Sequence, residues 1–196
     1  MNTKTKSMVY CGLFTALIAV GAFIKVPVPV MPFTLQYLFT MLAGLLLGAK
    51  RGAIAVLAYM LLGLAGLPIF TEGGGLWYVL KPSFGYIIGF VIGTYVTGRI
   101  AETMLKKTIP HYLLANLAGL AIVYACGMSY YYVICNYVID TPIAVWPLFL
   151  YCFILAVPGD IALSVVGAVI AKRVRPLVFN VFGQDTVTEA ATTGRA

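Results

Sequence analysis

Charged side chains are scarce in this sequence, and their scarcity excludes most water-soluble folds. Only 10% of the residues are charged, 62% are hydrophobic, and the mean hydropathy is +0.99. Soluble domains carry roughly 25% charged and 45–50% apolar residues. Several apolar runs approach the roughly 20 residues that are needed to cross about 30 Å of hydrocarbon. The composition therefore predicts an integral membrane protein.

Sequence motifs for catalysis, nucleotide binding and metal coordination are also missing. There is no HExxH, GxSxG, Walker A or Gly-rich dinucleotide motif, and the one histidine, His111, falls between predicted helices. The four cysteines lie inside apolar runs without CxxC spacing, which is typical of small packing residues. We therefore expect no enzyme, no metal site and no cofactor, and any use of ATP must come from a partner.

Charges and Pro/Gly breaks divide the chain into six apolar segments, which predict an all-α domain of six transmembrane helices over residues 1–180. The segments are 7–24, 34–49, 52–69, 84–105, 112–139 and 143–172, and the second is short. The first lacks a small-residue cleavage site, so we expect it to be a retained helix. Residues 181–196 are small and polar, and predict a disordered tail.

The distribution of lysine and arginine predicts the orientation, because cytoplasmic loops retain basic residues. If the N-terminus is inside, only Lys25 and Lys81 of the 13 basic residues lie outside. We therefore expect both termini in the cytoplasm, in the cytoplasmic membrane of a bacterial cell. The net charge of +7 is spread over inner helix ends, which suits anionic lipid and gives no indication of nucleic-acid binding.

Asp160 is the strongest candidate for a functional residue, because it lies inside the sixth apolar segment. A carboxylate at membrane depth costs roughly 2.5–3.5 kcal/mol on insertion scales and normally faces a polar cavity. Its structural alternative is to cap the helix break at Pro158 and Gly159 or to pair with another buried group.

Other polar and aromatic groups fall near the predicted outer ends of the helices. With Asp160 they suit a compact uncharged head group that carries an acidic tail, with N–H donors at Asp160 and a carboxylate near Lys81. The candidate ligand-binding residues are Asp160, Gln36, Thr34, Lys81, Ser83, Tyr86, Trp77, Tyr78, Asn116 and Tyr151.

The first helix carries two ridges of small residues at four-residue spacing. Gly12 and Ala16 form one ridge, and Thr15 and Ala19 form the other. Such ridges let two helices approach closely. The partner helix is either another helix of this chain or one of a second subunit.

Four motifs, taken in order, resemble the BioY family, the biotin-specific substrate-binding components (S-components) of energy-coupling-factor (ECF) vitamin transporters. They span residues 29–36 (PVMPFTLQ), 57–70 (LAYMLLGLAGLPIF), 81–90 (KPSFGYIIGF) and 158–160 (PGD). The resemblance implies a six-helix S-component that binds biotin near its outer side. It also implies assembly with a transmembrane coupling protein and two ABC-type ATPases.

The resemblance implies site residues at Thr34, Gln36, Lys81, Ser83, Gly85, Tyr86 and Asp160. Three features depart from the family pattern. Ser83-Phe84-Gly85 stands where a Thr-Gly-Gly type sequence is usual, and Leu163 stands where a lysine is frequent, so Lys81 is the candidate to replace that lysine. The coupling helix usually carries Ala-x-x-x-Ala, where this chain has the two ridges described above.

Two alternative functions remain open at this point. One is an S-component for another vitamin, thiamin or riboflavin, which would share the helices but differ in the pocket. The other is a small intramembrane enzyme or channel-like protein, in which Asp160 would be a catalytic or ion-path group.

The predicted topology can be tested by cysteine labelling in a background that lacks the native cysteines. A cysteine at Lys50 should stay unlabelled when an impermeant thiol reagent is added to intact cells, because this position is predicted to face the cytoplasm. A cysteine at Lys25 should be labelled and serves as the control. Labelling at Lys50 from outside would reject this orientation.

Overall fold

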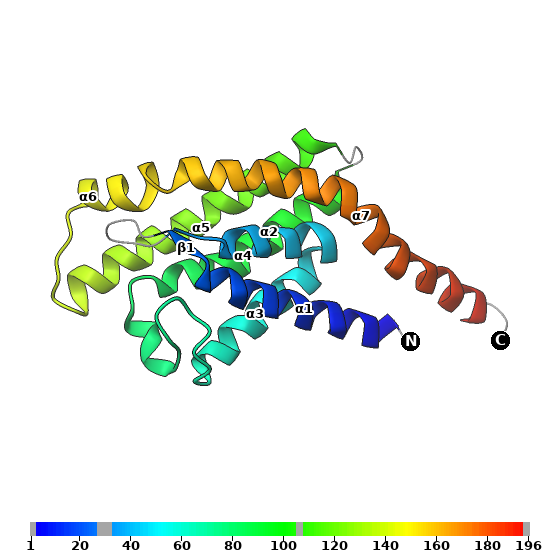
Figure 1. Cartoon of the computed structure of the whole chain (residues 1–196), viewed down its shortest axis with the longest axis horizontal. Helices are drawn as coiled ribbons and strands as arrows, with labels where there is room; N and C mark the ends of the chain where they lie inside the picture. Colours follow the sequence, from blue (N-terminus) through cyan, green and yellow to red (C-terminus); the bar gives the residue numbers. More distant parts are fainter. Residues whose placement is uncertain (1–2, 27–32, 105–107, 194–196) are drawn as a thin grey trace.

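The helices follow one another largely as the apolar segments predict. A computed structural model describes the backbone of residues 3–26, 33–104 and 108–193, and side chains in these ranges except at 3, 26, 33 and 179–193. In the described chain the helices are α1 (Thr3–Phe23), α2 (Gln36–Leu47), α3 (Ala49–Leu64), α4 (Phe84–Thr103), α5 (Ile109–Tyr137), α6 (Val145–Phe149) and α7 (Val157–Thr193) (Figure 1). The prediction of an all-α fold is confirmed.

The sixth predicted segment is interrupted in the structure. It comprises α6, a π-helical turn over Leu150–Ile154, and α7, which extends beyond the predicted end at residue 172. Turns of π-helix inside α-helical segments are rare and frequently lie at functional sites. The division into a domain over 1–180 and a tail over 181–196 stays a prediction, because side chains from residue 179 and all of 194–196 lie outside the description.

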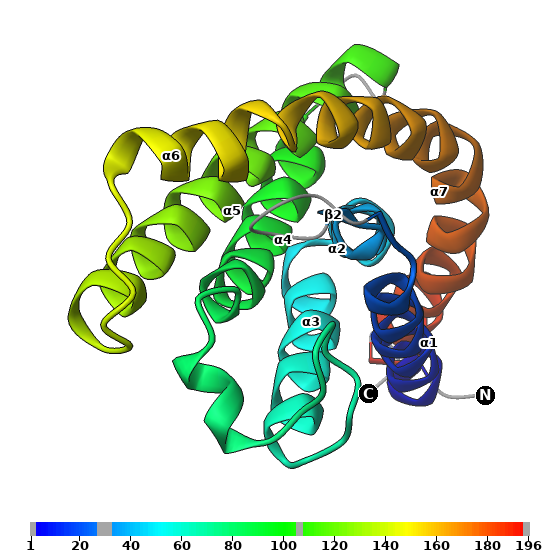
Figure 2. The same ribbon diagram turned by 60° about the vertical axis from the view of Figure 1, so that its left-hand side comes forward.

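Four described helical segments are long and apolar enough to cross a membrane. They are Lys4–Phe23, Phe84–Thr103, Ile109–Tyr137 and Val145–Val178. The 12 residues of α2 rise only about 18 Å, but α2 lies at the centre with α1, α3, α4 and α7 around it (Figure 2). Most of its side chains are buried. A helix that is enclosed by other helices has no need to match the thickness of the bilayer.

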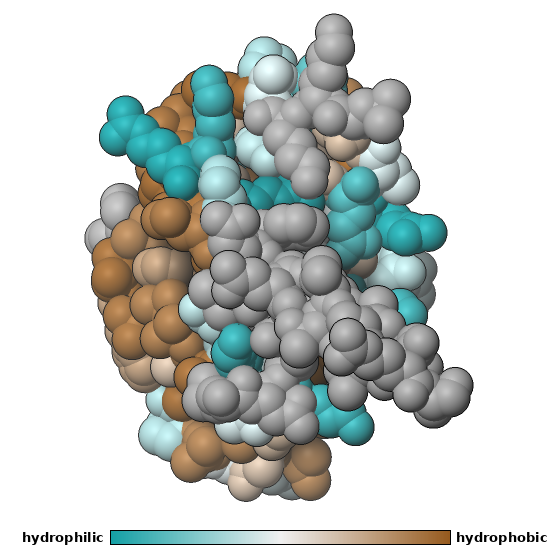
Figure 3. Space-filling model, turned by 90° about the vertical axis from the view of Figure 1, so that its right-hand side faces the viewer, coloured by the Kyte–Doolittle hydropathy of each residue, from teal (hydrophilic) through white to brown (hydrophobic). Residues whose placement is uncertain are grey.

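The molecule has two distinct ends. The start of α1 and the C-terminal part of α7 lie at one end, and the pair of strands β1 (Lys25–Val26) and β2 (Phe33–Thr34) lies toward the other (Figure 1). Hydrophilic side chains are scattered over the end with the termini, and hydrophobic ones cover a flank beside it (Figure 3). The prolines between the strands, within 27–32, lie outside the described residues.

The buried core changes in character along the bundle. Toward the end with the termini, where α1, α2, α3, α4, α5 and α7 all contribute, it is rich in alanine, including Ala43, Ala55, Ala101 and Ala115. Toward the strands it consists mainly of tyrosine and phenylalanine. Alanines let helices approach closely, whereas large rings of different orientation leave space between them. The aromatic half is therefore the part of the bundle that can enclose a ligand.

Glycines bring α4 close to its neighbours on two faces. Toward α5, a Cβ built on Gly93 would lie 2.8 Å from the Gly119 carbonyl oxygen, and one on Gly89 would lie 2.9 Å from Val123 Cα. Toward α3, a Cβ on Gly98 would lie 2.5 Å from the backbone nitrogen of Ala49. Real Cβ atoms do not approach backbone this closely, so only glycine allows these contacts.

Gly98→Ala should therefore destabilise the folded protein, by roughly the 1–3 kcal/mol typical of overpacking. Thermal unfolding in detergent measures the change. Gly12→Ala is the matched control, because a Cβ there meets nothing within 4 Å, and we expect an unchanged or slightly raised unfolding temperature. An equal response of the two variants would contradict the close packing of α4 on α3.

Candidate functional site

A cavity of about 140 Å³ lies in the aromatic half of the bundle. Its walls come from α2, α4, α5, the π-helical turn, α7, β2 and the loop between α3 and α4. Most residues predicted from the sequence line it, namely Thr34, Gln36, Tyr78, Lys81, Ser83, Tyr86, Tyr151 and Asp160. Side chains from distant parts of the chain thus meet in one place.

Asp160 forms the buried end of this cavity. It lies in the first turn of α7, where the helix dipole favours a negative charge, and its exposed fraction is 8%. Pro158 occupies the same first turn, where its missing N–H costs little. The hydroxyl of Tyr124 donates a hydrogen bond to Oδ2 of Asp160. One carboxylate oxygen is therefore held in place, and Oδ1 remains available to a ligand.

Tyrosines surround the carboxylate. The rings of Tyr86 and Tyr124 pack edge to face with their centroids 6.2 Å apart, and Phe153 packs on Tyr124 at 5.2 Å. The Tyr86 hydroxyl is buried and finds no hydrogen-bond partner among the described residues; its neighbour Cys152 offers only a weakly bonding thiol. A buried hydroxyl without a partner is costly. Tyr86 is therefore ready to donate to a polar ligand atom.

Gln36 lines the cavity from the start of α2. Its amide nitrogen donates to the Tyr59 hydroxyl at 2.8 Å, and that hydroxyl donates to the carbonyl of Ile69 at 2.9 Å. The amide oxygen of Gln36 accepts from Thr34 across 3.5 Å. These bonds fix the orientation of the amide. Its oxygen is held only weakly and can accept a further hydrogen bond in the cavity.

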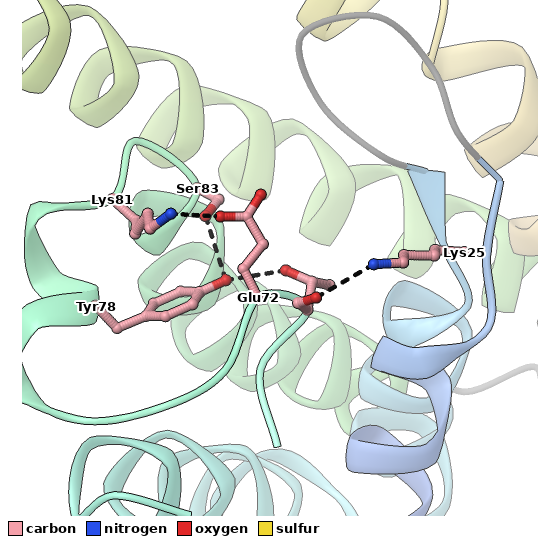
Figure 4. Close-up of polar contacts among 6 residues, drawn as sticks. Lys25, Glu72, Tyr78, Lys81 and Ser83 are labelled. Atoms are coloured by element: carbon pink, nitrogen blue, oxygen red, sulfur yellow. Dashed lines mark hydrogen bonds and ion pairs between the residues drawn. The ribbon is translucent and has the colours of Figure 1, made fainter. Parts of the chain in front are cut away.

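The α3–α4 loop lines the cavity with Thr71, Glu72, Tyr78, Lys81 and Ser83. The exposed pair Glu72 and Lys81 forms the mouth (Figure 4). The Thr71 and Tyr78 hydroxyls are 2.9 Å apart, and Ser83 donates to Tyr78 at 3.4 Å. Lys81 Nζ donates to Glu72 Oε2 at 2.8 Å, and this contact raises the pKa of Lys81. The loop therefore presents a protonated amine to the cavity.

Two predicted ligand-binding residues lie outside the cavity lining. Trp77 is 82% exposed, because it projects from the short 3₁₀ turn Leu76–Leu80 whereas its neighbour Tyr78 points inward. Asn116 is fully buried, and its amide nitrogen donates to the Ser164 carbonyl at 2.9 Å. Trp77 is thus a surface residue and Asn116 joins α5 to α7, and neither belongs to the cavity lining.

Sequence reasoning missed other residues that line the cavity. Tyr37 follows Gln36 directly, and its hydroxyl contacts Ser164 at 3.1 Å and donates to the Asn116 carbonyl at 2.9 Å. Tyr124 and Tyr131 come from the middle of α5, and Glu72 comes from the α3–α4 loop. Glu72 could have been found from its charge next to a glycine run. The tyrosines carry no such signal in a chain that is rich in aromatics.

The four small residues of α1 divide between two environments. Gly12 and Ala16 face outward, beside the exposed apolar side chains of Val9, Leu13 and Val20. Thr15 is buried and donates to the Ala55 carbonyl of α3 at 2.9 Å, and Ala19 packs against the aromatic core. The first ridge is therefore open to another molecule, whereas the second holds α1 to this chain.

The chemistry of the cavity is that of binding. Among the side chains that the structure describes, no three His, Cys, Asp or Glu residues come together as metal ligands. Asp160 and Gln36 offer acceptors, Tyr86 offers a donor, Lys81 offers a positive charge, and aromatic rings fill the space between them. Such a site suits a small ring system with polar edges and an acidic group.

Comparisons with known proteins agree with this description. A relative in Lysinibacillus sphaericus, named "Probable biotin transporter BioY", is 43% identical over 170 residues, which are 87% of each chain. The "Biotin transporter BioY" of Thermotoga maritima is 40% identical over 173 residues, which cover 88% of this chain and 97% of the relative. The matching relatives are transport proteins, not enzymes.

A solved structure has the same fold. It is the crystal structure of the S-component for biotin from an ECF-type ABC transporter, with a TM-score of 0.74 and 28% sequence identity. The match covers 88% of this chain and 92% of the solved one. The fold predicted from the four motifs, that of an ECF S-component, is thereby confirmed. A model of the BioY family matches residues 1–180, and the chain belongs to that family.

Proposed function

We propose that this protein captures biotin in its cavity as the substrate-binding component of an ECF-type uptake transporter. The observation that carries the proposal is that one aromatic cavity has Asp160 at its buried end and Lys81 at its mouth. Biotin has the matching chemistry: a cyclic urea with two N–H donors and one carbonyl, an apolar bicycle, and a chain that ends in a carboxylate.

Asp160 and Tyr86 complement the urea. Oδ1 of Asp160 accepts an N–H of the ring, while Tyr124 keeps the carboxylate in position through Oδ2. The unpaired hydroxyl of Tyr86 donates to the urea carbonyl, which relieves the cost of its burial. A charged acceptor and a neutral donor together distinguish a urea from a ring that lacks either group.

Lys81 receives the carboxylate of the chain. It is the one lysine or arginine among the described residues of the cavity lining. Leu163, where the family frequently has a lysine, packs against the aromatic core and offers no charge. Lys81 is 51% exposed in its side chain, so a ligand carboxylate meets it near water, where an ion pair is weak but still selects for charge.

The exposed ridge of α1 serves a partner subunit. Gly12 and Ala16 let a helix approach closely, and Val9 and Leu13 beside them offer apolar contact. We assign this face to the transmembrane coupling protein, with two ABC-type ATPases supplying the hydrolysis for which this sequence has no motif. The complex lies in the cytoplasmic membrane with both termini of this chain inside.

The alternative functions lack support of this kind. The matching relatives carry names of biotin transporters, which disfavours an S-component for thiamin or riboflavin. An intramembrane enzyme would need reacting groups near Asp160, and the group that contacts its carboxylate is the phenol of Tyr124. Equilibrium binding of labelled biotin to the purified protein, with thiamin and riboflavin as competitors, tests the choice of ligand directly.

Asp160→Asn should weaken biotin binding far more than it lowers the amount of folded protein. A neutral amide loses the charge-assisted bond, which is worth roughly 1.5–3 kcal/mol, so affinity should fall about ten- to a hundredfold. Titration calorimetry in detergent measures affinity, and a thermal scan measures stability. Asp160 would not belong to the site if the variant were well folded and bound biotin as the wild type does.

Ser164→Ala is the matched control for Asp160→Asn. Ser164 lies one turn further along α7, is fully buried, and is absent from the cavity lining. Its loss removes the contact with Tyr37, so stability should fall while affinity changes little. Similar losses of affinity in both variants would indicate that Asp160 acts through the packing of α7.

A bulky residue at position 16 should weaken assembly with the coupling protein and leave biotin binding intact. In Ala16→Trp the large ring would hold the partner helix away from α1, whereas the exposed position leaves the fold of this chain unaffected. Co-purification with the partner and biotin binding to the isolated protein are measured together. In Ala19→Trp, which disturbs the aromatic core, both should fall; equal loss of both in Ala16→Trp would refute the assignment.

A further inference from the structure

The mouth of the cavity holds an ammonium and a carboxylate that already satisfy each other. Lys81 Nζ lies 2.8 Å from Glu72 Oε2, and both residues line the cavity. Their side chains are 51% and 46% exposed, so each can turn toward water or toward a ligand. Lys25, which is nearby, donates instead to the Thr71 carbonyl at 3.4 Å and is not part of the lining (Figure 4).

The two carboxylates among the described lining residues differ in burial and in bonding partner. Asp160 is buried and its Oδ2 is held by Tyr124, whereas Glu72 is half exposed at the mouth and its partner is Lys81. A ligand that gives its N–H groups to Asp160 and extends a chain outward ends beside the Glu72–Lys81 pair. If that chain ends in a carboxylate, it meets the ammonium of Lys81, which is already paired with Glu72.

We propose that Glu72 is a specificity-determining residue. It pairs with Lys81 before a ligand binds, and the carboxylate of an acidic ligand replaces it in that ion pair. This inference rests on the proposed function, because it needs a ligand with a polar head and an acidic tail. Glu72 then sets how strongly the site prefers an acid over a neutral molecule of the same shape.

Charge balance at the mouth supports this exchange. Two carboxylates at one ammonium leave an excess negative charge, and like charges a few ångströms apart disfavour each other. Glu72 can leave because nearly half of its side chain already faces water. An acidic ligand must therefore break the Glu72–Lys81 ion pair and form its own contact with Lys81. A neutral amide can bind and leave the Glu72–Lys81 pair in place.

The test compares biotin with its primary amide on the full-length protein in detergent, by calorimetry. In Glu72→Gln the ammonium is released from its carboxylate, so biotin should bind about two- to fivefold more tightly, the size expected for an exposed ion pair. The affinity for the amide should be unchanged. In a Lys81→Met background, Glu72→Gln should give a smaller gain, because no ammonium is left to release.

Asp140→Asn is the matched control. Asp140 is an exposed acid in the loop between α5 and α6, outside the cavity lining, with φ of 50°, which asparagine tolerates as well as aspartate does. Its removal changes the charge of the surface without touching the mouth, so the affinities for both ligands should stay as in the wild type.

Three results would overturn the exchange. An equal change for biotin and its amide in Glu72→Gln would mean that Glu72 shapes the loop. The same gain with and without Lys81 would mean that Glu72 only repels the acid. Unchanged affinity for biotin would mean that Lys81 does not meet the carboxylate. Failure of the wild type to bind either ligand would be a different result, because it would overturn the proposed function itself.

Discussion

A carboxylate inside a membrane-spanning segment must have polar neighbours, and the aromatic half of this bundle is arranged around that requirement. Asp160 lies in the first turn of α7 and lines the cavity together with residues of α2, α4 and α5. Tyr124 of α5 holds one of its oxygens. The regular α-helix is interrupted before this point by the π-helical turn, and α7 then begins with Pro158 in its first turn. The carboxylate, the helix break and the cavity are thus one structural feature.

The polar groups next to the cavity are themselves held by a buried network. Tyr37 of α2 bonds to Ser164 and to the Asn116 carbonyl, and Asn116 bonds to the backbone of α7. Three helices are thereby fixed relative to one another just behind the site. Since unsatisfied polar groups are costly in an apolar interior, this network sets the stagger of the helices more strictly than apolar packing does.

The close packing around α4 has the complementary role. Its glycines bring α3 and α5 to backbone contact, and the alanines of the other core cluster do the same near the termini. Small residues in one half and large aromatic rings in the other make one half of the bundle compact and leave a cavity in the other. The mouth then depends on the α3–α4 loop, whose hydroxyls and ion pair lie at the surface, where the contacts are weaker and exchange more readily.

The amino-acid sequence alone predicts the order of the helical segments, of which the structure divides the sixth, and the prominence of Asp160. Each of these follows from local quantities, because the cost of placing a segment or a charge in hydrocarbon depends little on the rest of the fold. The apolar runs predict the helices with errors mainly at their ends, as in α3, which stops at Leu64 although the apolar segment continues to residue 69. Most residues predicted as ligand-binding line the cavity, but they are eight of its twenty described lining residues.

The direction in which neighbouring side chains point, and the depth at which they lie, depend on how the helices pack. Trp77 and Tyr78 are adjacent and equally aromatic, but a 3₁₀ turn sends one outward and the other into the cavity. Asn116 and Tyr124 lie about two turns apart on α5, and the position of α7 against that helix decides that Tyr124 meets Asp160 while Asn116 meets backbone. Depth and orientation depend on contacts between helices that are distant in the sequence, and no local pattern records them.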